Sequence, residues 1–198
     1  MNVVNNKLFG ILLCLLAMLP FMVSCEIQDD FSYETSITPE DPLFDGTAWK
    51  FIQDNAKEGE YKLLEEAIKL TNLQSLYEQN DKRTFVLPLD VAFTEWLKGN
   101  NFNSLSEVDV DVLGELLKYN IVKGEYNSSV PAYFEKDIQF EFETEAAGKN
   151  IFFSHDSNYR ININKGMNIG ASVEVYLSNI VPVNGVIHAT KVLVEYKP

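Results

Sequence analysis

The stretch TFVLPLDVAF at positions 84–93 places a strand, a proline and a helix start within ten residues. Its first four residues are apolar or β-branched, which favours a buried strand, and Pro88 stops the strand because proline has no backbone N–H to donate. Asp90 then stands at the expected N-cap of a helix that carries Phe93 on its apolar face and runs to Gly99. The stretch therefore predicts a strand that leads directly into a helix.

Amphipathic helices are expected on both sides of this stretch. Apolar residues recur at intervals of three and four in three preceding segments, residues 47–59, 63–70 and 73–77. Thr47 is placed to cap the first of these helices. Acidic residues then open a helix over residues 109–121 that Gly124 closes, an arrangement that the helix dipole favours. The first half of the chain is therefore predicted to be mainly helical.

The period of the apolar residues changes to two from Asp137 onward. The expected strands lie within residues 138–143, 159–164, 173–177, 181–183, 186–188 and 192–196. Asn184 and Gly185 suit a tight turn that needs positive φ. We therefore predict an α+β fold in which N-terminal helices pack on a mainly antiparallel β-sheet.

The amino terminus has the features of a lipoprotein signal peptide. An almost unbroken apolar run, residues 8–23, follows Lys7 and is near the lower limit for a membrane span. The next residues complete the sequence MVSC, which resembles a lipobox, where a cysteine thiol receives a diacylglycerol before the signal is cleaved. We expect residues 1–24 to be removed and Cys25 to be lipidated. The alternative is that Cys25 is an ordinary residue of an uncleaved anchor.

The mature chain is expected to be acidic and free of thiols. Cys14 lies in the signal and Cys25 is the lipidation site, so no cysteine remains for a disulfide or a metal site. The formal net charge of −13 repels nucleic acid, so we expect membrane attachment through the lipid anchor and no nucleic-acid partner. Residues 25–46 are expected to be a flexible tether. Its acidic start is similar to the surface-export signal of Bacteroidota-type lipoproteins, although an ordinary solvated linker is the alternative.

Three segments resemble the fasciclin family of cell-adhesion domains. They are TFVLPLDVAF at 84–93, LLKYNIVKGEY at 116–126 and NGVIHATKVL at 184–193. The residues that match the family's motifs are Pro88, Asp90, Phe93, Tyr119, Gly124, Asn184, Gly185 and His188. The resemblance implies a fasciclin-like domain over residues 47–198, with helices packed on a sheet that forms a wedge or sandwich.

Some positions depart from the family pattern. Leu89 stands where the family usually has a threonine, and Asn120 replaces the histidine of its Tyr-His pair. The terminal motif also lacks the aspartate that customarily follows the histidine. The integrin recognition attributed to the Tyr-His region in animal members is therefore not expected here. The apolar positions are intact, so the implied fold is less affected.

The matching polar residues also have structural interpretations. His188 lies on an apolar strand and is expected to be a buried, hydrogen-bonded histidine. Asp90 is expected to be a helix cap before it is a ligand. Tyr119 and Tyr126 are expected to pack with their hydroxyls hydrogen-bonded.

No residue pattern predicts catalysis. The chain has two histidines, and it contains no HExxH, GxSxG or GxxxxGK string. The glutamates within residues 141–145 alternate with phenylalanines, which favours a solvated sheet face over a carboxylate site. Ser128 or Ser129 with His155 would be a hydrolase pair, but no nucleophile elbow surrounds them. We therefore expect a protein that is not an enzyme and requires neither a cofactor nor a metal.

A binding role rests on aromatic residues in expected loops. Tyr126, Tyr133 and Phe134 fall in one loop segment, where exposed rings would stack on sugars or insert into a partner. The alternative is that these rings cover the sheet edge. Tyr159 and Arg160 form a second, weaker candidate.

These observations support three hypotheses of function. The leading one is a non-enzymatic lipoprotein of the outer membrane, exposed at the cell surface, that mediates adhesion or binds an outer-membrane protein or a surface glycan. The alternative is an accessory lipoprotein of a SusCD-like complex that takes up glycans or peptides. The third is an envelope hydrolase that uses Ser128 or Ser129.

Overall fold

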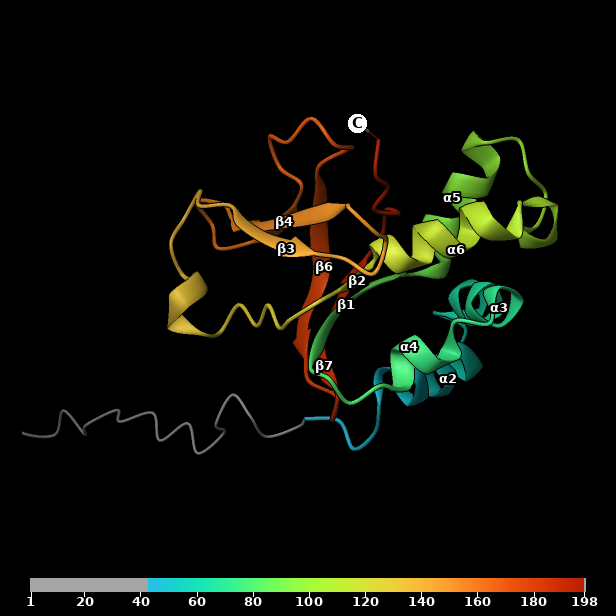
Figure 1. Ribbon diagram of the computed structural model, residues 1–198, viewed down its shortest axis with the longest axis horizontal. Coiled ribbons are helices and arrows are strands. Elements are labelled where there is room, and N and C mark those ends of the chain that lie inside the picture. Colours follow the sequence, from blue (N-terminus) through green and yellow to red (C-terminus); the bar gives the residue numbers. More distant parts are fainter. Residues whose placement is uncertain (1–42, 198) are drawn as a thin grey trace, which may run out of the picture. The chain divides into compact units, whose positions relative to one another are not determined.

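The structure, a computed structural model, describes residues 43–197 (Figure 1). The expected signal peptide, Cys25 and the tether up to residue 42 lie outside the described residues. No helix of the described part has the length and apolar character that a membrane span requires. Its α-helices are α2 (Ala48–Glu58), α3 (Lys62–Thr71), α4 (Gln74–Glu78), α5 (Asp90–Gly99) and α6 (Val110–Tyr119). Short 3-10 helices are η2 (Leu105–Glu107) and η3 (Pro131–Tyr133).

The strands form one mixed sheet. They are β1 (Arg83–Pro88), β2 (Ile121–Val122), β3 (Phe140–Glu143), β4 (Asn150–His155), β5 (Ile161–Ile163), β6 (Val173–Ile180) and β7 (Gly185–Thr190). Their order is β2-β1-β7-β6-β5-β4-β3, and neighbours are antiparallel except for β1 and β7, which run parallel along their whole length. The architecture confirms the predicted α+β fold class. The parallel pair was not predicted, because it joins segments that lie about a hundred residues apart in the chain.

The two edge strands of the sheet, β2 and β3, come together. Val122 of β2 and Thr144, which follows β3, form an isolated antiparallel bridge. Beside it, the Lys123 N–H donates to the Glu143 carbonyl at 2.8 Å and the Glu145 N–H donates to the Ile121 carbonyl at 2.9 Å. Irregular pairing between β6 and β7 bends the sheet on its opposite side. The sheet therefore curls until its first and last strands touch.

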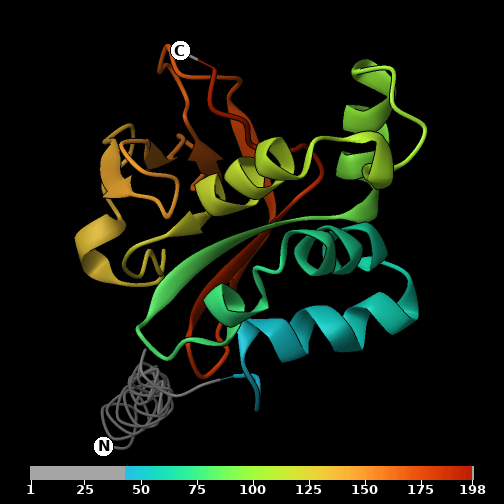
Figure 2. The same ribbon diagram turned by 45° about the vertical axis from the view of Figure 1, so that its right-hand side comes forward.

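The alternation of side chains along β1 divides them between two cores. Phe85 and Leu87 pack against the helices, in a cluster that we call the helical core. Val86 points the other way, into the interior of the curled sheet, in a cluster that we call the sheet core. Figures 1 and 2 show β1 and β7 between the helices and the β3–β4 hairpin. The central strands thus present buried residues to both sides, and every residue of β1 and β7 is buried.

Local capping fixes three helix ends as expected. The Thr47 hydroxyl accepts from the Lys50 N–H at the start of α2, and Gly59 ends that helix in the left-handed conformation. The Asp109 carboxylate accepts from two N–H groups at the start of α6. These signals lie within one helical turn of the helix that they delimit, so the sequence alone was sufficient to find them.

Asp90 caps a different helix from the one predicted. Helix α5 begins at Asp90 itself, and Leu89 holds the N-cap position without a side-chain hydrogen bond. The Asp90 carboxylate instead accepts from the Leu63 N–H at 2.8 Å, in the first turn of α3. The Asp90 N–H also donates to the Glu60 carbonyl at 2.9 Å. The prediction of a local cap was wrong because a free N–H of a neighbouring helix lies against this carboxylate.

Three segments differ from their predicted structure. Helix α6 ends at Tyr119, so Ile121 belongs to β2 and Gly124 follows that strand rather than closing the helix. Residues 192–196 form no strand, because Leu193 packs in the helical core and the next residue in the sheet core without a strand partner. Residues 181–183 lie in the connection between β6 and β7 and are not a strand.

The β6–β7 connection holds the start of the described chain. The Phe44 N–H donates to the Val181 carbonyl at 3.0 Å, and the Val183 N–H donates to the Gly46 carbonyl at 2.9 Å. The Asn184 side chain accepts from the Ala48 N–H at 2.8 Å and donates to two carbonyl groups at the end of α4. The first helix is thereby attached to the last hairpin.

Gly185 has a positive φ of 152° and lies against β1. A Cβ atom there would lie 1.9 Å from the Arg83 carbonyl oxygen. The close approach of the two parallel strands therefore requires glycine at this position.

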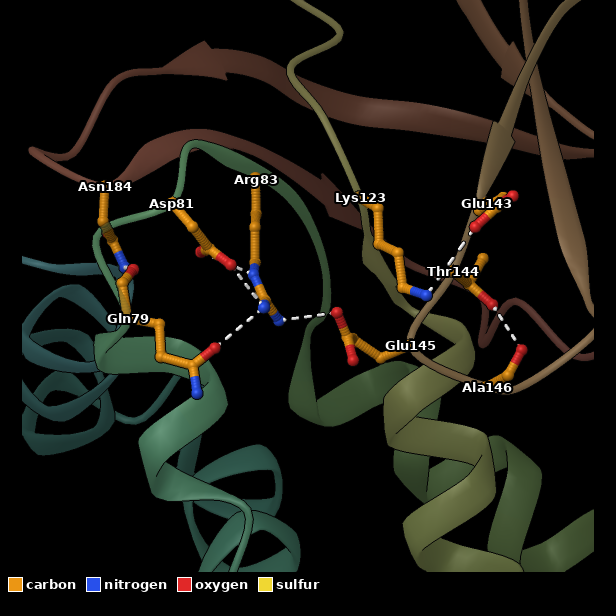
Figure 3. A network of polar contacts seen from close by, with 9 residues as sticks. All are labelled: Gln79, Asp81, Arg83, Lys123, Glu143, Thr144, Glu145, Ala146 and Asn184. Carbon is orange, nitrogen blue, oxygen red and sulfur yellow. Dashed lines mark hydrogen bonds and ion pairs between the residues drawn. The ribbon is translucent and has the colours of Figure 1, made fainter.

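Arg83 joins the helices to the far edge of the sheet (Figure 3). Its guanidinium donates to Asp81 at 2.6 Å and to the Gln79 side chain at 2.7 Å, and it forms an ion pair with Glu145 at 2.9 Å. The Nη1 atom that faces Glu145 makes no well-aligned hydrogen bond, so that contact is mainly electrostatic. Glu141 and Glu143 are exposed, as predicted for a solvated face, whereas the Glu145 side chain is only 20% exposed. Because the Arg83 side chain is buried as well, the network has a structural role.

Candidate binding site

The sheet core is built around Tyr126 and His188. The Tyr126 ring stacks on Phe153 with a centroid distance of 4.5 Å, and its hydroxyl is buried without a hydrogen-bond partner among the described residues. His188 is fully buried, and its Nε2 lies 2.8 Å from the Tyr126 carbonyl oxygen. Nδ1 accepts a longer contact of 3.4 Å from the Asn179 N–H, so the neutral tautomer carries its proton on Nε2. Burial lowers the pKa of His188 to about 4.

Tyr119 and Asn120 are also structural. The Tyr119 hydroxyl donates to the Asn150 carbonyl at 3.1 Å and accepts from the Asn164 side chain at 3.0 Å. Burial raises the pKa of Tyr119 to about 12. The Asn120 amide donates to the Val194 carbonyl at 2.9 Å and so holds the C-terminal segment on α6. Tyr119 and Asn120, which stand where the family has its Tyr-His pair, therefore use their polar groups in hydrogen bonds within the fold.

The predicted loop aromatics differ in exposure. Tyr126 is fully buried, as the expectation that it packs predicted, so it offers no exposed ring for binding, but its hydroxyl has no hydrogen-bond partner among the described residues, which contradicts the expectation of a bonded hydroxyl. The ring is buried because Thr84 of β1 binds the Tyr126 N–H at 2.7 Å and draws this residue into the sheet core. Tyr133 is half-buried against the same core. Phe134 is 48% exposed and remains a candidate for binding.

Tyr159 lies beside this loop. The segment that contains Phe134 runs along β4, where Lys136 and His155 form an isolated parallel bridge. Tyr159 is 56% exposed, and the Lys136 ammonium lies over its ring, 4.0 Å from the centroid. The segment that contains Phe134 thus contacts Tyr159 through Lys136. We call the exposed group formed by Phe134, Lys136, Tyr159 and Arg160 the Tyr159 surface.

Arg160 is fixed by acidic neighbours. Its guanidinium lies 2.9 Å from Asp156 and 2.8 Å from Glu174. Backbone hydrogen bonds from Arg160 and Asn158, together with the Arg160 side chain, lower the pKa of Asp156. These contacts hold the turn that presents Tyr159 at a φ of 60°. The charge of Arg160 is therefore already paired with two carboxylates, and the main role of this residue is to hold the turn of Tyr159 in place.

The candidate catalytic groups are not brought together. The Asn179 side chain donates to the Ser128 hydroxyl at 2.7 Å and to the Ser129 hydroxyl at 3.1 Å. The Nδ1 of His155 lies 2.8 Å from the Tyr133 carbonyl. Across residues 43–197, no hydrogen bond joins either serine to His155, and no group of three His, Cys, Asp or Glu residues could hold a metal ion.

A pocket that the sequence did not indicate lies between α5, α6 and the C-terminal segment. Its volume is about 380 Å³, within the range of small-molecule sites. Its apolar lining consists of Trp96, Val112, Leu116, Tyr119 and Tyr196. We call it the α5–α6 pocket.

Charged side chains complete this pocket. Glu195 accepts from the Trp96 indole N–H at 2.9 Å, and Lys149 forms an ion pair with Glu115 at 3.2 Å. The hydrogen bond from Lys149 is the largest cause that lowers the pKa of Glu115, and that carboxyl is therefore ionised at neutral pH. Asp111 also lines the pocket.

Sequence reasoning missed the pocket because its residues come from distant segments. Trp96 was predicted on the apolar face of a helix, and Tyr196 was predicted in a strand that does not form. The only signal was the amphipathic character of both rings, which favours a half-buried position with the polar edge bonded.

The chain was compared with protein-family models, curated sequences and solved structures. A family model described as the fasciclin domain matches residues 59–194. Among solved structures, the chain is similar to a FAS1 domain pair from the insect cell adhesion molecule fasciclin I, with 14% sequence identity and a TM-score of 0.46. That match covers 75% of this chain and 45% of the other, so this chain spans less than half of its length. No curated protein sequence matches this chain.

Proposed function

Because this chain belongs to the fasciclin domain family, whose members are typically adhesion or binding modules, we propose that it is a non-enzymatic lipoprotein that mediates adhesion at the cell surface. The observation that carries the proposal is the family match, which extends over most of the described residues. Its partner is an outer-membrane protein or a surface glycan.

The proposed attachment is a lipid on Cys25 after removal of residues 1–24. The apolar run and the MVSC sequence support this cleavage, and the acidic cluster that follows supports export to the outer face of the outer membrane. Several acyl chains on one protein give lasting attachment, because each buried methylene contributes about 0.8 kcal/mol. The tether that precedes the hydrogen-bonded residues 44–46 then presents the domain beyond the membrane.

The Tyr159 surface is the proposed contact with the partner. Phe134 and Tyr159 expose apolar rings on adjacent segments, and Lys136 adds a cation beside them. Rings of this kind bury large apolar area at a low cost in conformational entropy. The surface thus combines the aromatic and charged groups that are common at protein and sugar interfaces.

Protease treatment of intact cells tests the surface location. The domain should be cleaved on intact cells while a periplasmic control protein survives. Complete protection of the domain would contradict export to the outer face. Mass spectrometry of the native protein should also show a diacylated or triacylated Cys25 as the first residue. Consistent copurification with a large transporter would favour the accessory-subunit hypothesis instead.

A matched pair of variants tests the Tyr159 surface. Tyr159→Ala should reduce the attachment of purified full-length protein to cells of the producing strain by about tenfold, the effect of losing one interface anchor of about 1.4 kcal/mol. Tyr176→Ala is the control, because Tyr176 is 60% exposed and also has a lysine ammonium over its ring, 3.5 Å from the centroid. Equal attachment by both variants, or equal loss, would exclude the Tyr159 surface.

A further inference from the structure

We propose that the α5–α6 pocket binds a small organic cation, an alkylammonium or guanidinium group with apolar substituents. The pocket uses none of the residues of the Tyr159 surface. It can therefore bind its ligand whether or not the domain mediates adhesion.

The pocket lining carries an excess of negative charge. Three carboxylates line it, those of Asp111, Glu115 and Glu195, against the single ammonium of Lys149. Asp111 takes part in none of the ion pairs of the described residues. These carboxylates would repel an anion and attract a cation. The net charge of −13 of the whole chain acts in the same direction.

Two lysines outside the pocket lining compensate this charge only in part. Lys118 lies 3.3 Å from Glu115, and Lys197 lies 2.7 Å from Glu195. The Lys197 side chain is 65% exposed and the Lys118 side chain 36% exposed, so water and salt screen the first pair strongly and the second less. The second oxygen of Glu115 faces the pocket side, where Lys149 binds it.

The position of Lys149 shows that the walls accept a cation. Its ammonium lies 3.2 Å from the Glu115 carboxylate and 5.7 Å from the centroid of the Tyr196 ring. A carboxylate and an aromatic face on two sides of an ammonium are the arrangement by which proteins recognise alkylated amines. A ligand cation would compete with Lys149 for these two groups, whereas Asp111 lines the pocket without an ion-pair partner among the described residues.

The apolar lining determines what the cation must carry. Val112, Leu116 and the ring of Trp96 face the same space and have no charge to offer. A bare metal ion would leave them unused and would find no preformed ligand cluster, whereas methyl groups or an alkyl chain would cover them. The combination favours an amine or guanidine with an apolar body.

The two tryptophans of the chain provide an internal probe. The Trp96 indole N–H is bonded to Glu195 in the pocket, whereas Trp49 is buried in the helical core. We would record the two indole N–H signals of the full-length chain by NMR, in a polyoxyethylene detergent that carries neither charge nor sugar. Choline and N-acetylarginine amide are the probes, and methyl glucoside is the neutral comparison.

Both cations should shift the Trp96 signal in a saturable way, with a dissociation constant on the order of 1 mM, and leave the Trp49 signal in place. Added salt should weaken the effect. If neither cation produces a saturable shift, the pocket is not a cation site. A shift by methyl glucoside alone would overturn the proposed ligand class and indicate a sugar site.

Two valines of α6 give a matched pair of variants. Val112 lines the pocket and is 57% exposed, whereas Val110 is 52% exposed in the same helical turn but does not line it. Val112→Lys places a cation at the pocket mouth and should weaken binding of choline by about tenfold or more. Val110→Lys should leave binding unchanged. An equal effect of the two substitutions, with the fold of both verified by their NMR spectra, would contradict the site.

Discussion

The two cores of this domain share strand β1 but are held together differently. The helical core contains aliphatic and aromatic side chains that pack between the helices and one face of the sheet. The sheet core contains a group of aromatic rings centred on Tyr126, with buried polar residues such as His188 and Asn164 among them. Packing alone can stabilise the helical core, whereas the sheet core also depends on hydrogen bonds in the interior of the curled sheet.

This difference indicates how each core should respond to substitution. In the helical core, a lost side chain leaves a cavity, and the cost follows its volume. In the sheet core, the cost depends on whether a polar group keeps its partner. Three predictions separate these responses, beginning with the largest effect.

The largest effect is expected from a cavity in the helical core. Phe93 is fully buried, so Phe93→Ala should lower the free energy of unfolding by about 4 kcal/mol. Val91→Ala on the same helix is the control, because Val91 is exposed and should change the stability by less than about 0.5 kcal/mol. Urea denaturation measures both. Similar losses in the two variants would show that the burial of Phe93 in the helical core does not set the stability of α5.

The next effect is a loss of stability in acid that originates in the sheet core. Burial lowers the pKa of His188 from 6.5 to about 4 in the folded chain. Between these values the unfolded chain binds a proton that the folded chain does not, so the free energy of unfolding falls as the pH falls. The full loss is up to about 3 kcal/mol and is complete near pH 4.

His188→Gln removes this titration and should flatten the pH dependence between pH 6.5 and pH 4 relative to the unsubstituted chain. Phe93→Ala should retain the whole dependence, because it alters only the other core. Urea denaturation at several pH values would measure the pH dependence of the free energy of unfolding in each variant. An unchanged slope in His188→Gln would mean that carboxylates alone cause the acid sensitivity.

The smallest effect compares two tyrosine hydroxyls. The Tyr119 hydroxyl has two hydrogen-bond partners, and the buried Tyr126 hydroxyl has none among the described residues. Tyr119→Phe should therefore lower the free energy of unfolding by about 1 kcal/mol, and Tyr126→Phe should raise it by about 1 kcal/mol. Thermal unfolding of the two variants measures the difference. Effects of the same sign would contradict the assigned bonding.

The sequence was sufficient where the deciding interaction is local. Thr47, Gly59 and Asp109 act on groups within a few residues, and Pro88 ends β1 as predicted. It was insufficient for Asp90, whose partner lies 27 residues away on another helix. Residues 192–196 have the apolar pattern of a strand because they are buried, and burial alone does not reveal that a strand partner is lacking.

The same distinction applies to the candidate sites. Tyr159 and Phe134 were recognised because exposed loop aromatics leave a local signal, although their proximity depends on the bridge between Lys136 and His155. Tyr126 lies in the same loop segment but was drawn inside by Thr84, a contact over 42 residues. The α5–α6 pocket needs two helices, Lys149 and the segment of Glu195 and Tyr196 at once, so no single segment of sequence contains it.

The hydrogen bonds that join residues 44–46 to the β6–β7 connection have a mechanical consequence. Any pull on the domain from its amino-terminal side reaches these bonds before it reaches helix α2. The load then passes to the last hairpin, and through β7 to the centre of the sheet. A module that resists shear between a cell and its surroundings would benefit from this route, because tension is spread over the strand ladder instead of unravelling the first helix.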